Sequence, residues 1–252
     1  MNGFMAFFKK ECIENLKNHR LFILFTLFLI FGITNAPIAK YTPDILAALA
    51  ENVQITMKSS AINSWEQFFK NISGVGFSVV IILFGSCLSH EYTSGTIVLM
   101  VTKGLSRSIV VMVKFIVSVL IMSLCFWTCF ILTYGYTIYI WPSSSLSNLL
   151  EAAALLWVEG ILYLSILILG CVCFKQTFSS ILFTGSVVAL LSLMKHVECL
   201  STVTPVRLST ENISIILGTS AMSDLYVPII LTLLGIGVFL LLAIFVFERK
   251  IL

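Results

Sequence analysis

The sequence predicts an all-α polytopic membrane protein, and three observations support this fold class. Apolar residues make up 59% of the 252 residues and charged residues 11%, whereas soluble domains average about 45–50% and about 25%. The mean hydropathy is +1.06. Six runs are apolar and approach the roughly 20 residues that a membrane-crossing helix needs. They are residues 21–39, 72–88, 115–136, 152–174, 177–194 and 227–247. A soluble enzyme is excluded, and residues 1–252 form one predicted membrane domain.

Residues 1–20, which precede the first run, form a polar arm that we expect to carry an interfacial amphipathic helix from about residue 4. Apolar residues recur at helical spacing, and charged residues fall on the other side. The apolar set is Met5, Phe8, Cys12 and Leu16, and the charged set is Lys10, Glu14 and Lys17. We expect the apolar side to rest on the inner membrane surface and the charged side to contact a cytoplasmic partner. A solubilising basic arm is the alternative.

The first run, residues 21–39, has some features of a secretory signal peptide. It is longer than a usual signal-peptide core, it lacks an Ala-x-Ala cleavage site, and it follows the polar arm. We therefore expect a retained membrane span.

The distribution of basic residues predicts the orientation. With the N-terminus inside, ten of the fifteen Lys and Arg residues fall in inner segments and five in outer segments. Positive residues favour the cytoplasmic side. The prediction is a multi-pass protein of the plasma membrane with both termini in the cytoplasm.

Both long outer loops carry helix signals. Residues 42–44 read Thr-Pro-Asp, the favoured order of an N-cap, a first-turn proline and an acid. Residues 64–67 read Ser-Trp-Glu-Gln, a capping box. In the loop 195–226, Thr210 is a candidate N-cap for a helix that ends at Gly218. We expect short external helices at these places.

The inner loop between the second and third runs predicts a short helix. Ser94 is a candidate N-cap, Gly95 begins the helix, Gly104 ends it, and Lys103 lies favourably in its last turn. Such a helix of about nine residues is roughly 13 Å long. It is too short to span a membrane and too apolar to stand in the cytosol. It must rest in the membrane interface or in a groove of this protein or another.

The seven cysteines predict neither a disulfide framework nor a metal site. Most of them lie within apolar runs, as small apolar side chains do. Cys171 and Cys173 are two residues apart, and residues at that spacing on a helix do not face each other.

One stripe of the second run and one acidic residue are candidates for a translocation route. The stripe recurs at i, i+4, i+7 and i+11 and comprises Phe77, Ile81, Phe84 and Leu88. If it faces a second subunit, the route is narrow and apolar; the alternative is a lipid-facing stripe. Glu159 is the one acidic residue well inside a predicted span, with Tyr163 as a possible partner on the next turn. Its role is open between handling of substrate or cations and a structural hydrogen bond.

The region around the inner loop resembles the ABC-2-type permeases. A Glu-x-x-Ser-Gly-Thr stretch follows the second run, an apolar segment comes next, and a Ser-Arg pair and a Lys open the third run. These residues are Glu91, Ser94, Gly95, Thr96, Ser106, Arg107 and Lys114. The six-span layout fits the same family. One departure is Ile97, where the family usually has Leu.

The resemblance implies how the chain works. A second permease subunit, identical or related, would pair with this one in the lipid bilayer, and two ATPase subunits would dock beneath them. The short inner helix would be a coupling helix seated in the ATPase, and the N-terminal helix would be a second contact. The implied coupling residues are Glu91, Ser94, Gly95, Thr96, Leu99, Lys103 and Arg107.

The sequence agrees with a division of labour between chains. It contains no Gly-Lys dipeptide and so lacks a Walker A phosphate loop. We expect this chain not to be an enzyme and to hold no cofactor or metal, with ATP and Mg²⁺ bound by the partner. We expect no nucleic-acid partner.

The predicted function is the membrane subunit of an ATP-driven exporter of a hydrophobic or amphipathic compound, such as a peptide toxin, bacteriocin or antibiotic. The cargo class rests on the resemblance and the apolar stripe, and the direction rests on the resemblance. The alternatives are an ATP-driven sodium extrusion permease and a non-transporting membrane anchor or sensor. A secondary transporter is disfavoured because no internal repeat is visible.

Overall fold

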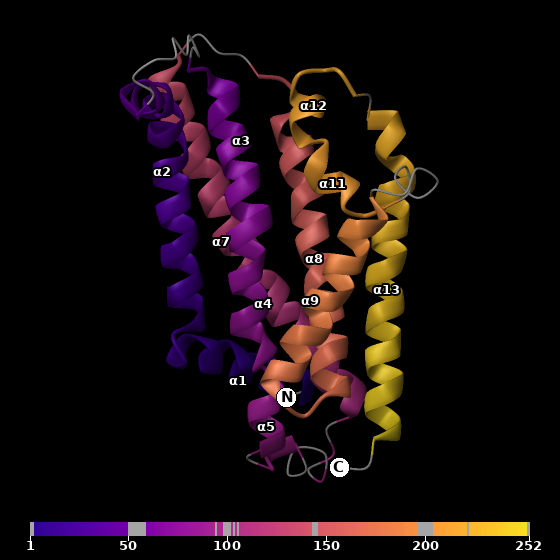
Figure 1. Ribbon diagram of the computed structural model, residues 1–252. Helices are drawn as coiled ribbons and strands as arrows, with labels where there is room; N and C mark the ends of the chain where they lie inside the picture. The colour runs from indigo at the N-terminus through magenta and orange to yellow at the C-terminus, as the bar shows by residue number, and fades with distance from the viewer. Residues whose placement is uncertain are drawn as a thin grey trace.

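The computed structural model is a bundle of long helices (Figure 1). It describes residues 3–49, 59–93, 95–97, 102, 104, 106–142, 146–195, 204–220 and 222–250. The helices are α1 (Gly3–Lys17), α2 (Arg20–Leu49), α3 (Ala61–Asn71), η1 (Ile72–Gly76), α4 (Phe77–Gly85), α5 (Ser89–Thr93), α7 (Arg107–Ile140), α8 (Leu149–Cys173), α9 (Thr177–Met194), α11 (Arg207–Thr210), α12 (Asn212–Ile216), η2 (Met222–Leu225) and α13 (Tyr226–Arg249). Within these residues there is no strand, and the all-α fold class is confirmed.

Six helical segments are long and apolar enough to cross a membrane, as the sequence predicts. They are Arg20–Pro43, Ala61–Gly85, Arg107–Ile140, Leu149–Cys173, Thr177–Met194 and Ser223–Arg249. Both chain ends lie at the same end of the bundle (Figure 1), as an even number of crossings requires. We call this the terminal end, with the described residues 3–20, 86–93, 95–97, 102, 104, 106–107, 173–177 and 247–250. The other is the distal end, with the described residues 40–49, 59–61, 140–142, 146–149, 194–195, 204–220 and 222–226.

The prediction that an external helix begins at residue 42 is wrong. Helix α2 runs without a break through Pro37 and Pro43 to Leu49. Thr42 lies inside this helix and donates a hydrogen bond from its hydroxyl to the carbonyl oxygen of Ile38 at 2.6 Å. Long membrane helices tolerate prolines where neighbouring groups satisfy the backbone, so the Thr-Pro-Asp order does not mark a helix start here.

The prediction that a separate external helix begins at residues 64–67 is also wrong. Helix α3 begins at Ala61 and continues through η1 into α4 as one span. Ser64 is therefore not a cap: it is buried and shares a 2.8 Å hydrogen bond with the hydroxyl of Thr137 on α7. The second span is longer at its distal end than the apolar run 72–88.

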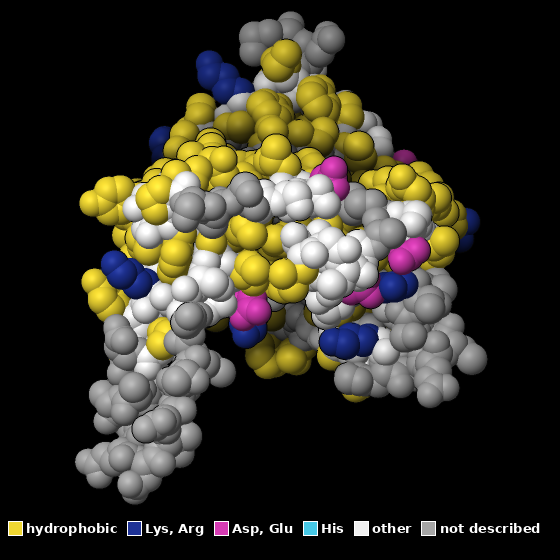
Figure 2. Space-filling model, turned by 90° about the horizontal axis from the view of Figure 1, so that it is seen from above, with side chains coloured by type: hydrophobic (Ala, Val, Ile, Leu, Met, Phe, Trp, Pro, Cys, Tyr) yellow, Lys and Arg dark blue, Asp and Glu magenta, His cyan; other side chains and the backbone are white. Residues whose placement is uncertain are grey.

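Helix α8 is the centre of the bundle. It packs against α13, α9, α7 and α4. Of the residues in its apolar membrane-spanning stretch 83% are buried in the bundle, against 11% for α9 and 11% for α13. Close approach is possible because Gly160 lacks a side chain: a Cβ there would lie 2.6 Å from Cε1 of Phe77. From the distal end, apolar side chains dominate the rim and charged ones are scattered (Figure 2). The rim is suited to lipid or to another apolar surface.

The distal loop before the sixth span enters the bundle. Helices α11 and α12 both pack against α8, and α12 also packs against α3. Leu208, Asn212 and Ile215 are buried. The segment 204–216 thus packs into the bundle through its buried residues, while Thr210 stays exposed.

The helix predicted to begin at Thr210 differs in its start. Thr210 is the last residue of α11, and α12 follows from Asn212 to Ile216. The predicted end at Gly218 is confirmed, because Gly218 has a φ of +70° and its N–H bonds to the carbonyl oxygen of Ile215. A positive φ of this size favours glycine.

Candidate functional site

Helix α1 lies across the terminal end and packs against α7 and α2 (Figure 1). Its buried residues are Phe7, Glu11 and Asn15, one helical turn apart. The Asn15 side chain donates to the carbonyl oxygen of Glu11 at 2.9 Å. The face of α1 toward the bundle is therefore largely polar, and it needs polar partners there.

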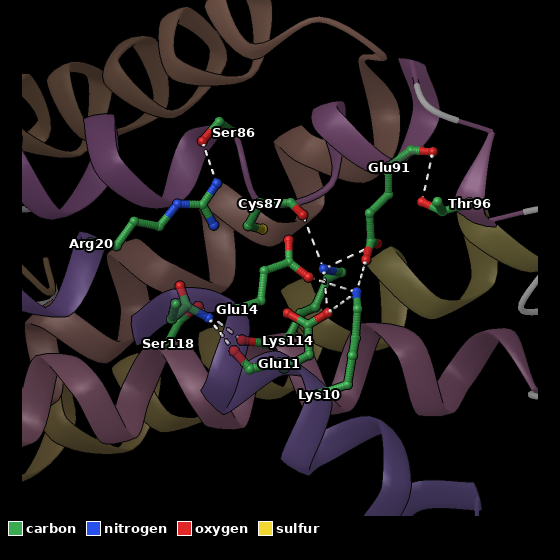
Figure 3. A network of polar contacts seen from close by, with 11 residues as sticks. Lys10, Glu11, Glu14, Arg20, Ser86, Cys87, Glu91, Thr96, Lys114 and Ser118 are labelled. Atoms are coloured by element: carbon green, nitrogen blue, oxygen red, sulfur yellow. Dashed lines mark hydrogen bonds and ion pairs between the residues drawn. The ribbon is translucent and has the colours of Figure 1, made fainter. Parts of the chain in front are cut away.

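Five charged side chains from three elements supply these partners, and we call them the charge cluster. They are Lys10, Glu11 and Glu14 on α1, Glu91 on α5, and Lys114 on α7 (Figure 3).

Lys114 is the buried centre of the charge cluster. Its ammonium group lies 3.0 Å from Oε1 of Glu11 and 3.0 Å from Oε2 of Glu91. It also donates to the carbonyl oxygen of Cys87 at 3.0 Å. The Lys114 side chain is 1% exposed. One buried cation thus holds α1, the α4–α5 connection and α5 against α7.

Lys10 forms the outer side of the charge cluster. Its ammonium group lies 2.6 Å from Oε1 of Glu91, 2.8 Å from Oε2 of Glu14 and 3.1 Å from Oε1 of Glu11. The Lys10 side chain is 42% exposed. Glu91 is therefore held between two lysines on different helices.

The surroundings of Lys10 and Glu14 on α1 favour the charged forms of both side chains. Burial acts to lower the pKa of Lys10, but hydrogen bonds to Glu14 and Glu91 and the nearby carboxylates outweigh it and raise that pKa. Burial acts to raise the pKa of Glu14, but the hydrogen bond and charge of Lys10, with the charges of Lys114 and Arg20, lower it. Both groups therefore stay ionised at neutral pH.

The formal charges of the cluster nearly balance. Two lysines and three glutamates leave a net charge of −1, and Arg20, whose charge acts on Glu14, offsets it. Arg20 donates to the hydroxyl of Ser86 at 2.8 Å, which adds α2 to the assembly. Removing one partner from a buried ion pair costs about 3–5 kcal/mol, because the other charge stays behind.

The three carboxylates raise the question of a metal ion. One ligand oxygen each from Glu11, Glu14 and Glu91 lie within 4.8 Å of one another. The ammonium groups of Lys10 and Lys114 lie among these oxygens at ion-pair distance. The lysines already supply the positive charge that a metal would bring.

Arg107 anchors the other flank of the inner loop. Its guanidinium Nη1 donates to the carbonyl oxygens of Phe247, Glu248 and Lys250 at 3.0, 3.0 and 2.6 Å. These carbonyls end α13, where a cation is favourable because the helix dipole is negative. The loop is thus tied to α13 as well as to α7.

Lys250 makes a second contact of the same kind. It donates to the carbonyl oxygens of Val172 and Cys173, at the end of α8, at 2.7 and 3.0 Å. Its ammonium group lies 5.0 Å from the ring centroid of Tyr92, and Tyr92 packs edge-on against Phe247. Both flanks of the inner loop therefore contact the end of α13.

The predicted coupling residues have mixed outcomes. Ser94, Leu99 and Lys103 lie outside the described residues, and so does most of the predicted helix. Glu91 is 2% exposed and forms the ion pairs given above. Thr96 donates to the carbonyl oxygen of Glu91 at 3.4 Å.

The two glycines of the loop are positioned as cap residues. Gly95 and Gly104 have φ angles of +68° and +86°, and a Cβ at either would meet nothing within 4 Å. Close backbone approach within this chain is therefore not the reason for glycine at Gly95; its positive φ is.

Most of the α1 residues that were predicted to contact a partner form ion pairs within this chain instead. Lys10 and Glu14 belong to the charge cluster, and Lys17 is exposed. Of the predicted apolar side, Met5 and Leu16 are exposed, whereas Phe8 and Cys12 pack partly against the core.

The predicted apolar stripe requires a correction. Phe77, Ile81, Phe84 and Leu88 are 3%, 9%, 1% and 0% exposed within a single chain. Phe77, for example, packs edge-on against Tyr163 of α8. The stripe faces neither lipid nor a second subunit, because α4 turns it toward the rest of its own bundle.

Glu159 does have the predicted partner. The hydroxyl of Tyr163 donates to Oε1 of Glu159, and the hydroxyl of Ser209 on α11 donates to the same oxygen at 3.2 Å. Glu159 is 1% exposed. The link to Ser209 was not predicted, since it joins residues fifty positions apart.

Glu11 is the site residue that the sequence reasoning missed. It lies at helical spacing from Phe7 and Asn15, a pattern that would have placed an acid on the buried face. Its buried partner Lys114 was noted only as part of the family resemblance.

Comparison of the sequence with models of known protein families finds no match, and no curated protein matches it either. The function must therefore be argued from the residues and their arrangement.

Proposed function

We propose that this chain is the membrane subunit of an ATP-driven exporter, and that a separate ATPase drives it through the inner loop at the terminal end. The observation that supports this proposal is the placement of Glu91. It opens the Glu-x-x-Ser-Gly-Thr stretch, and its two oxygens pair with Lys10 at 2.6 Å and Lys114 at 3.0 Å.

The arrangement suits transmission of movement. Glu91 and Arg107 stand on either side of the inner loop, and each is bonded to a different part of the bundle. Glu91 is held by α1 and α7, and Arg107 by the end of α13. A force on the loop therefore acts on α1, α7 and α13 together, because charge-assisted hydrogen bonds, which are roughly twice as strong as neutral ones, connect its two flanks to these helices.

The proposed cargo is a hydrophobic or amphipathic compound. The apolar stripe of the second span lends no support to this class, since it is buried within the chain. The cargo class rests on the family resemblance alone.

The test is the ATPase activity of the complete complex. The full chain is purified from its native membrane with the proteins that bind it, and ATP hydrolysis is measured with and without an amphipathic peptide. We expect a co-purified ATPase whose stimulation by the peptide is lost in Glu91→Gln. Glu66→Gln is the matched control, because Glu66 lies on α3, 42% exposed and 4.0 Å from Lys70. A preparation without an ATPase, or full stimulation in Glu91→Gln, would overturn the proposal.

The cargo class is tested by the same measurement. If sodium ions stimulate hydrolysis and amphipathic peptides do not, the sodium extrusion alternative replaces the proposed cargo. If an ATPase binds and no transport follows in vesicles, the anchor or sensor alternative replaces export.

A further inference from the structure

Glu159 has an acceptor atom that the rest of the bundle leaves unsatisfied. Both hydroxyl donors, from Tyr163 and Ser209, go to Oε1. Oε2 is buried and has no hydrogen-bond partner among the described residues. The residue as a whole is 1% exposed. A carboxyl oxygen in such a position is costly, and its charge state decides how costly.

No ion pair compensates the charge of Glu159 within the part of the chain that the structure describes. The ion pairs of the described residues do not include it. Of the elements packed on α8, α4, α9 and α12 have no ionisable side chain in their sequences. The nearest charged groups along α11 are Arg207 and Glu211, which pair with each other.

The remaining elements carry their ionisable groups elsewhere. Helix α13 has Tyr226 at its distal end and Glu248 and Arg249 at its terminal end. Helix α7 has Arg107 and Lys114 at the terminal end. Its cysteines Cys125 and Cys129 lie within the bundle, and neither forms a hydrogen bond or ion pair with Glu159. Tyr163 is therefore the one titratable group shown to face Glu159 among the described residues, and it does so as a hydrogen-bond donor.

These observations favour a proton over a metal ion. A bound cation needs several oxygens whose lone pairs converge, six to eight for a hard cation such as Ca²⁺. Here the hydroxyl of Tyr163 directs its hydrogen at Oε1. The hydroxyl of Ser209 shares its hydrogen between Oε1 at 3.2 Å and the carbonyl oxygen of Val206 at 3.0 Å, so both hydroxyls act as donors to the carboxyl group. A proton on Oε2 removes the charge and leaves both hydrogen bonds to Oε1 intact. Its O–H has no acceptor among the described residues, but a buried neutral hydroxyl without a partner costs less free energy than a buried carboxylate without one.

We propose that Glu159 is a proton-binding site, and that its proton keeps the segment 204–216 seated on α8. Ser209 joins Glu159 directly to that segment, and its neighbours Leu208 and Ile215 are buried in the bundle. Loss of the proton to water leaves an unpaired carboxylate inside apolar surroundings. The segment then lifts from α8 and admits water to Glu159, which opens the distal end of the bundle.

This proposal does not depend on the exporter function, because it concerns the chain alone. The first test is infrared spectroscopy of the purified full chain in lipid. We expect a carbonyl stretch from a protonated carboxyl group at neutral pH, and its loss in Glu159→Gln. Glu151→Gln is the matched control, since Glu151 is exposed in the first turn of the same helix. Absence of the band in the wild type, or its persistence in Glu159→Gln, overturns the proposal.

The second test measures whether the segment lifts. Leu208→Cys places a thiol at a buried position of the segment, and Thr210→Cys places one at an exposed position two residues away. The rate of thiol labelling at position 208, divided by the rate at 210, removes the intrinsic pH dependence of the reagent. We expect this ratio to rise with pH by up to about tenfold per pH unit once the carboxyl titrates, as linkage to one proton requires.

Two controls make the second test decisive. In Glu159→Gln the ratio stays at its low neutral-pH value, because glutamine cannot lose the proton and still accepts from both hydroxyls. The same rise with pH in Glu159→Gln overturns the proposal. So does a ratio that falls when sodium chloride replaces choline chloride at high pH, because that result identifies a sodium site.

Discussion

Replacement of Lys114 by methionine tests the charge cluster most sharply. Lys114 lies 3.0 Å from a carboxylate oxygen of Glu11 and of Glu91, and its side chain is 1% exposed. Methionine keeps most of the side-chain volume and removes the charge, which leaves three glutamates and one lysine. Breaking a buried ion pair in this way costs about 3–5 kcal/mol. At about 2–4 °C per kcal/mol for a chain of this size, the midpoint of thermal unfolding should fall by roughly 6–20 °C.

The assay is thermal unfolding of the purified full chain in one detergent, followed by tryptophan fluorescence. Lys9→Met is the matched control, because Lys9 is exposed on the same helix as Lys10 and such surface changes stay within about 0.5 kcal/mol. Adding Glu11→Gln to Lys114→Met should recover part of the loss, since it removes one of the uncompensated carboxylates. A shift for Lys114→Met no larger than the control, or a double variant that is worse than the sum of both, would refute the ion-pair reasoning.

Three further predictions use the same thermal measurement or amide exchange. Arg107→Met should lower the free energy of unfolding by about 1.5–3 kcal/mol and speed amide exchange in the last turn of α13, because charged hydrogen bonds to three carbonyls are lost. Faster exchange in other helices without a change in the last turn of α13 would contradict the capping role. Gly160→Ala should cost about 1–3 kcal/mol, since its Cβ would lie 2.6 Å from a Phe77 ring atom, whereas Gly237→Ala, which meets nothing within 4 Å, should stay within about 0.5 kcal/mol. The lowered pKa of Glu14 contributes stability above the unfolded value of about 4.3 that is lost as pH falls through the folded value. Glu14→Gln should therefore weaken the acid dependence of the unfolding midpoint, and an unchanged acid profile would contradict that role.

The membrane spans were largely predictable because their signal is local. Apolar runs of the right length identified all six, and the fifth has the predicted bounds. The third span is longer than predicted at its terminal end, where α7 begins at Arg107. The predicted run begins at residue 115, directly after Lys114, but Lys114 lies inside the bundle because Glu11 and Glu91 neutralise it. Those partners are distant in sequence, so no local pattern reveals them.

The orientation of the apolar stripe could not be predicted for a different reason. Lipid is about as apolar as a protein core, so hydrophobic periodicity does not tell which side of a membrane helix faces its own bundle. The small residue Gly160 admits Phe77 against α8, and that contact turns the stripe inward. Polar residues carried more information: Glu159 and Tyr163 were predicted to pair and do so.

The proposed sites lie toward opposite ends of the bundle and differ in how they are stabilised. The charge cluster joins α1, α5 and α7 through ion pairs at the terminal end, and Arg20 on α2 bonds to Ser86 beside it (Figure 3). At the Glu159 site the hydroxyl of Ser209 joins α8 to the distal loop, and the hydroxyl of Tyr163 on α8 donates to the same carboxyl oxygen. A partner that acts on the first site and a proton that acts on the second would control the two ends of the bundle separately.

The central proposal is that a separate ATPase binds the inner loop at the terminal end. Site-directed photocrosslinking in the native membrane tests this proposal most directly. A photoreactive amino acid is placed at Thr102, which is exposed in the inner loop, or at Thr219, which is exposed in the distal loop. We predict that position 102 captures a protein with a Walker A phosphate loop, identified by mass spectrometry, and that position 219 does not. Capture of that protein from position 219 and not from position 102, or capture of no ATPase from either, would contradict the proposal.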